Sequence, residues 1–99
     1  MADKATLSEQ KARGEEARLL AEHPLLNKAF ESINADLHRI WAESHPDETD
    51  KRHNAYLMQK LLEQLQQQFT KWMVEGQAAD RALSEIDQPS KIRRMINAR

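Results

Sequence analysis

Four histidines are the only side chains suited to acid–base chemistry near neutral pH or to nitrogen ligation of a metal: His23, His38, His45 and His53. Two of them, His45 and His53, flank an acidic stretch at residues 47–50, so a metal site there is conceivable. The histidines form neither an HExxH motif nor a pair four residues apart. This pattern favours polar residues that serve a turn and the ends of helices.

The motifs of the common enzyme classes are also missing from the sequence. The chain has no Cys, no Gly-rich phosphate loop and no GxSxG motif. The acidic stretch at residues 47–50 lacks the alternating ligands and central glycine of a calcium-binding EF-hand loop. We therefore expect a protein that is not an enzyme and that needs no metal or cofactor.

The charge of the chain is divided unevenly. The 15 basic and 16 acidic residues give a net charge of −1, but the last twelve residues hold four of the basic ones and no acidic one. Residues 1–87 therefore carry −5 and residues 88–99 carry +4. With Ser90 as a cap, this tail would form a short helix that could contact nucleic-acid phosphate, bind lipid weakly or fold on the groove of a partner protein, and a frayed terminus is the plain alternative. Its basic residues are Lys91, Arg93, Arg94 and Arg99.

Prolines and apolar periodicity divide the rest of the chain into helices. With only two Gly and three Pro, the 99 residues have too few turn residues for a β-sandwich or a series of βα units. We predict helices at about residues 6–22, 24–44 and 48–87. Together they make an all-α fold with a single helical domain over residues 1–87.

Local signals set the expected helix ends. Thr6 and Glu9 have the spacing of a capping box, which predicts the first helix start at Thr6. Pro24 suits the first position of a helix, so a short break should precede it. The stretch at residues 44–47, Ser-His-Pro-Asp, is a turn signal, after which Asp47 or Thr49 can cap the third helix.

The second and third helices carry apolar residues at spacings of three and four, as in a coiled-coil seam. A connection of about four residues makes the two helices antiparallel neighbours, with facing residue numbers that sum to about 92. The sequence thus predicts an antiparallel helical hairpin. Its seam residues are Leu26, Phe30, Ile33, Leu37 and Ile40 in the second helix, and Met58, Leu62, Leu65, Phe69, Trp72, Gly76, Ala79, Leu83 and Ile86 in the third.

The first helix is poor in large apolar residues but rich in small ones. The same sum of 92 places Gly14 near Ala78 and Gly76 near Glu16, so small residues of both helices would meet and let the backbones approach closely. We predict that the first helix continues the second past the break and lies against the distal half of the third. A compact three-helix bundle, with the first helix folded back, is the alternative.

One helix pair leaves apolar side chains without a partner. A core this small supplies little net stability, so the uncovered side chains favour self-association or docking on another protein. Trp41 and Trp72 fit a core or interface role better than stacking on nucleic-acid bases. The candidate interface residues are Trp41, Leu57, Leu61, Trp72, Met73, Val74 and Gly76.

The sequence contains no apolar run near the roughly 18 to 20 residues that cross a bilayer, and its N-terminus has no apolar core of a signal peptide. We expect a protein that neither spans a membrane nor is secreted.

Five segments of the chain carry a family resemblance: EARLL at 16–20, PLLNKAF at 24–30, WAES at 41–44, DKR at 50–52 and GQAA at 76–79. With these segments the chain resembles a family of short, uncharacterised helical proteins encoded among the head and virion-structure genes of tailed bacteriophages and prophages. The resemblance spans residue 16 to about residue 83 and omits the basic tail. It implies a virion assembly or accessory component, placed in the host cytoplasm or the virion, whose partner is itself or another phage structural protein. A small inhibitor or adaptor of a host protein or defence complex, and a weak nucleic-acid-binding module that uses the tail, are the alternatives.

Overall fold

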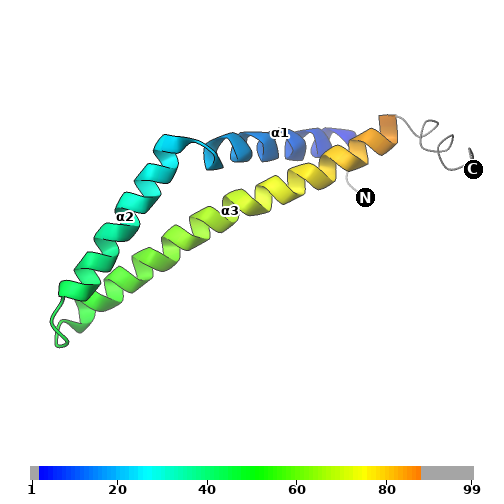
Figure 1. Cartoon of the computed structure of the whole chain (residues 1–99). Helices are drawn as coiled ribbons and strands as arrows, with labels where there is room; N and C mark the ends of the chain where they lie inside the picture. Colours follow the sequence, from blue (N-terminus) through cyan, green and yellow to red (C-terminus); the bar gives the residue numbers. More distant parts are fainter. Residues whose placement is uncertain (1–2, 88–99) are drawn as a thin grey trace, which may run out of the picture. The chain divides into compact units, whose positions relative to one another are not determined.

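The computed structural model describes residues 3–87, which form three helices and no strand (Figure 1). The helices are α1 (Lys4–Ala21), α2 (Pro24–Glu43) and α3 (Thr49–Asp87). Each bound lies within two residues of the expected one. The all-α fold class is confirmed, and α1 packs on the long helix α3.

The contacts of the chain gather in two compact units that share α3. Unit 1 contains α1 through Arg18 and α3 from Thr70 onward, and unit 2 contains residues 19–69. In Figure 1, unit 1 pairs α1 with the yellow and orange part of α3, and unit 2 pairs α2 with the green part. Each unit is therefore a pair of helices with its own apolar contact.

The helix α1 begins earlier than its predicted cap. Asp3 Oδ1 accepts a hydrogen bond from the Thr6 N–H at 2.7 Å, and the Asp3 carbonyl accepts from the Leu7 N–H at 3.0 Å. The prediction that Thr6 begins the helix in a capping box with Glu9 is thus wrong. Asp3 is an equally good cap, and the intervening Lys4 and Ala5 are good helix formers.

The break before Pro24 is confirmed. His23 has extended backbone angles (φ −69°, ψ 122°), and its Nδ1 accepts a hydrogen bond from the Leu25 N–H at 3.1 Å. The Asn27 side-chain amide donates to the Ala21 carbonyl at 2.9 Å and to the His23 carbonyl at 3.2 Å. The bonds to the Leu25 N–H and the Ala21 carbonyl satisfy backbone groups that the helix ends leave without helical partners, and the His23 carbonyl also accepts the first helical bond of α2, from the Asn27 N–H.

In unit 1, the closest contact joins two glycines. A Cβ added at Gly14 would lie 2.7 Å from the Gly76 Cα, and one added at Gly76 would lie 2.8 Å from the Gly14 Cα. Further along the same helix pair, Leu7, Ala79 and Leu83 form a buried cluster. The predicted meeting of small residues is confirmed, but the predicted register is off by two residues.

The expected partner of Gly14 was Ala78, and the observed one is Gly76. Facing numbers in unit 1 therefore sum to 90 at the glycines, and to 91 at the ion pair between Lys11 and Asp80, whose charged atoms lie 2.9 Å apart. Two backbones approach most closely where neither helix carries a Cβ, so the glycine pair fixes the register. The predicted register counts residues outward from the turn between the second and third helices, and this count does not include the preference for backbone contact at glycines.

In unit 2, the core is small. Phe30, Leu37 and Ala55 are its buried apolar residues, and Leu26 and Leu62 are half-buried. Four predicted seam residues are exposed instead: Ile33, Ile40, Met58 and Leu65. A pair of helices covers each seam side chain from one side only, so the predicted seam closes only in part.

Candidate interaction surface

An apolar groove follows the seam of unit 2 between α2 and α3. It has a volume of about 450 Å³, and all six side chains that line it are apolar: Ile33, Leu37, Met58, Leu61, Leu62 and Leu65. Four of them remain largely open, with exposed fractions of 47% for Ile33, 57% for Met58, 66% for Leu61 and 47% for Leu65. A groove with this lining offers a water-free contact to a second apolar surface and no group for acid–base chemistry.

Elsewhere in unit 2, two basic side chains lie over aromatic rings. The Arg52 guanidinium carbon lies 4.6 Å from the centre of the Trp41 ring, and the Lys60 ammonium lies 5.6 Å from the centre of the Tyr56 ring. Trp41 and Tyr56 also share a shallow hollow with His38 and Gln59. Trp41 is thus partly occupied by a contact within the chain, although 47% of it stays exposed.

The predicted interface residues fall into three groups. Trp41, Leu57, Leu61 and Val74 are exposed, as an interface requires of the free chain. Trp72 and Met73 are half-buried in unit 1, and Met73 lines a small hollow there with charged neighbours. Gly76 is buried against Gly14, so the structure assigns it to a contact within the chain.

The predicted seam puts three groove residues in the hairpin core, but the structure leaves them about half exposed: Ile33, Met58 and Leu65. The small size of the domain could have predicted this exposure, because two helices alone cannot enclose large side chains on all sides. The basic residues Lys91, Arg93, Arg94 and Arg99 lie outside the described residues.

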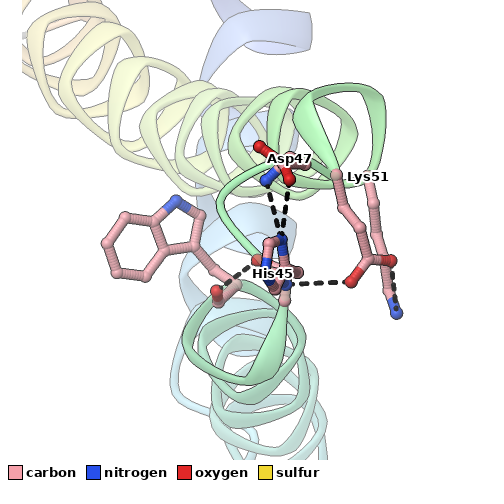
Figure 2. Close-up of polar contacts among 6 residues, drawn as sticks. His45, Asp47 and Lys51 are labelled. Atoms are coloured by element: carbon pink, nitrogen blue, oxygen red, sulfur yellow. Dashed lines mark hydrogen bonds and ion pairs between the residues drawn. The ribbon is translucent and has the colours of Figure 1, made fainter.

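The turn between α2 and α3 is built from polar contacts (Figure 2). The Ser44 hydroxyl donates to the Trp41 carbonyl at 2.6 Å, which ends α2. The His45 N–H donates to Glu48 Oε1 at 2.8 Å, and the Asp47 N–H donates to His45 Nδ1 at 3.1 Å. His45 therefore serves the turn, in line with the favoured interpretation.

The helix α3 begins directly after this turn. The Glu48 carbonyl accepts from the Arg52 N–H at 3.1 Å, which puts Glu48 at the N-cap position. The predicted caps, Asp47 and Thr49, are each one residue away. The Glu48 side chain faces back to the turn, where Oε1 bonds His45 and Oε2 lies 3.7 Å from the Lys51 ammonium (Figure 2).

His45 Nδ1 also lies 3.4 Å from Asp47 Oδ2 (Figure 2). The Nδ1 atom of His45 therefore lies between the backbone N–H and the carboxylate of the same residue, Asp47. Within residues 3–87, no three His, Asp or Glu side chains come close enough to hold a metal ion. The arrangement is that of a turn.

Two carboxylates at the starts of helices have lowered pKa values because of the hydrogen bonds that they accept. The backbone bond from His45 holds the pKa of Glu48 below its ordinary value, and the backbone bond from Thr6 does the same for the pKa of Asp3. A lowered pKa means that the folded chain favours the charged form. Each carboxylate therefore stabilises the fold at neutral pH, and this contribution is lost as the pH falls through the lowered pKa.

We expect the free energy of unfolding to decrease when the pH drops below about 4, the ordinary range of carboxyl groups. The variants Glu48→Gln and Asp3→Asn keep an oxygen acceptor at each position but cannot ionise, so they should lose less stability over this interval than the unaltered chain. Urea unfolding followed by circular dichroism at several pH values measures the difference. An equal acid loss in both variants would show that these bonds do not favour the charged form.

The fold and surface define an all-α protein built from antiparallel helix pairs, one of which leaves an apolar groove open. Among the described residues, no helix has both the length and the apolar character needed to cross a membrane. Comparisons of the chain with protein-family models, with curated proteins and with solved structures found no match.

Proposed function

We propose that the chain is a non-enzymatic helical protein that works by protein–protein interaction, as an assembly or accessory component of a bacteriophage virion. The observation that carries the interaction role is the open apolar groove of unit 2. Isolated apolar residues are common on protein surfaces, but a contiguous apolar groove favours a site of interaction. The virion context rests on the sequence resemblance to helical proteins encoded among phage head genes.

The groove suits assembly better than catalysis or transport of a small ligand. Its lining supplies apolar contact area along two helices and no group that would orient a reacting molecule. Helical surfaces of this kind recognise other helices through side chains spaced by three and four residues. On this proposal, the protein acts in the host cytoplasm and is retained in the particle, with the basic tail as a secondary contact to capsid protein or packaged DNA.

The proposal predicts that a tagged copy of the chain, expressed during phage production, co-purifies with virions through a density gradient. Mass spectrometry of the purified particles detects it. The variant Leu61→Glu should be depleted from particles by at least about tenfold, because it places a charge in the groove.

The matched control is Leu25→Glu, which makes the same change at an exposed position of α2 outside the groove. It should enter particles as the unaltered chain does. A chain that is absent from virions but captures a host enzyme or defence protein would contradict the virion role and favour the inhibitor or adaptor alternative.

A further inference from the structure

We infer that the apolar groove of unit 2 is covered by the same groove of a second copy of this chain, so that two unit 2 hairpins form a four-helix bundle. This inference rests on the proposed interaction role and names the partner. The groove supplies the contact from both copies, which makes the interface isologous.

The distribution of exposed apolar side chains singles out unit 2. Eleven of the thirteen large apolar residues that the structure shows as exposed lie between residues 19 and 69. Over the same span only Phe30, Leu37 and Ala55 are buried apolar residues. A unit of this length with so thin a core needs an added source of stability, and oligomerisation is a common one.

Among the described residues of unit 1, only Val74 and Ile86 are large apolar residues that remain exposed. There, Gly14 meets Gly76 at backbone contact distance, and the cluster of Leu7, Ala79 and Leu83 is buried. The small residues close that helix pair without a third helix. The second copy should therefore contact unit 2 rather than the glycine crossing.

The open face of the α2–α3 hairpin is large enough for a dimer when the whole length of α2 takes part. The twenty residues of α2 make a helix about 30 Å long, and two adjacent helices present a face about 20 Å wide. This face is about 600 Å² per copy, or about 1,200 Å² for the pair, which is the lower end of the range for stable interfaces, and the groove forms only its apolar centre. Pairing two such faces would cover the open side of Ile33, Met58, Leu61 and Leu65.

The chemistry of the groove also suits its own copy. All six lining side chains are apolar, so bringing two grooves together buries no charged lining residue of either copy. In a four-helix bundle made of two hairpins, each hairpin covers the open side of the other. A segment of another protein is the competing occupant.

The oligomeric state tests this inference. Sedimentation analysis of the full chain from about 1 µM to about 1 mM should show a dimer that dissociates on dilution. Leu61→Glu should weaken dimerisation by at least about a hundredfold, because a carboxylate from each copy would be buried without a partner. Leu25→Glu should leave the dimer unchanged, since Leu25 is 68% exposed and lies outside the groove.

Circular dichroism checks that each variant keeps its helix content. If Leu61→Glu loses it, Met58→Glu gives the same readout from a neighbouring position of the groove. A strict monomer over the whole concentration range, a dimer that survives both groove substitutions, or a dimer that Leu25→Glu also dissociates would overturn the inference. A monomer that still co-purifies with virions would overturn the inference alone, whereas a groove dimer that is absent from virions would overturn the virion role alone.

Discussion

Replacing Gly14 with leucine is expected to detach α1 from α3. The atoms in the way are backbone atoms: a Cβ at Gly14 would lie 2.7 Å from the Gly76 Cα and 2.7 Å from the Trp72 carbonyl oxygen. Neither can turn aside as a side chain would, so the helices must separate and expose Leu7 and its neighbours. We expect a loss of about 3 kcal/mol or more in the free energy of unfolding, measured in urea. Amide hydrogen exchange should rise along residues 4–18.

Substituting alanine at Gly14 tests whether a side chain at this position stabilises or destabilises the fold. In an open helix, Gly→Ala stabilises by about 1 kcal/mol because it removes the entropy cost of glycine. At Gly14 the contact with Gly76 should reverse this, so Gly14→Ala should destabilise. The matched control for Gly14→Leu is Ala12→Leu, which introduces the same side chain at an exposed position of the same helix, where little change in stability is expected. A stabilising Gly14→Ala would show that the two helices do not touch there.

The helix bounds of this chain could be predicted because their signals are local. Pro24 marks the start of α2, and the turn residues at 44–47 mark its end. The antiparallel arrangement followed from the short connection, and the meeting of α1 with α3 followed from the shared small residues. These inferences need only the spacing of residues along one chain.

The details of contact were harder to predict. The register of unit 1 depends on where two backbones come closest, which the glycine pair decides over a simple count from the turn. The helix starts depend on which of several polar residues takes the N-cap position. Asp3 takes it in α1 instead of Thr6, and Glu48 takes it in α3 instead of Asp47 or Thr49. Such competitions are settled by differences of about 1 kcal/mol or less, below what residue preference resolves.

The groove also shows why periodicity alone overestimates a core. Spacings of three and four identify the side of a helix that faces its neighbour, but they do not say how much of each side chain the neighbour covers. In unit 1, small residues allow backbone contact, and the seam closes at Gly76, Ala79 and Leu83, although Ile86 at its end is 52% exposed. In unit 2, the seam residues are large, so the flanks of Ile33, Met58 and Leu65 stay open. Side-chain size along one continuous pattern thus separates a closed helix pair from one that leaves a groove open.

Replacing Phe30 with alanine is expected to remove most of the stability of unit 2. Phe30 is only 8% exposed and is one of the few buried apolar residues of this unit. Truncation of a buried phenylalanine costs about 3 to 5 kcal/mol, from lost transfer free energy and from the cavity left behind. Small domains have total stabilities of about 5 kcal/mol at the low end, so the loss should be visible as partial unfolding at room temperature. Urea unfolding and amide exchange along α2 measure it.

The control for Phe30→Ala is Leu25→Ala, because Leu25 lies on the same helix and is 68% exposed. That change should shift the free energy of unfolding by no more than about 0.5 kcal/mol. Leu61→Ala adds a further comparison: its cost should be small in the monomer and should grow with protein concentration if a second copy covers the groove. If Phe30→Ala lowered the free energy of unfolding no more than Leu25→Ala does, then α2 would not pack on α3 through the face that carries Phe30. The groove between these two helices would then not form as described.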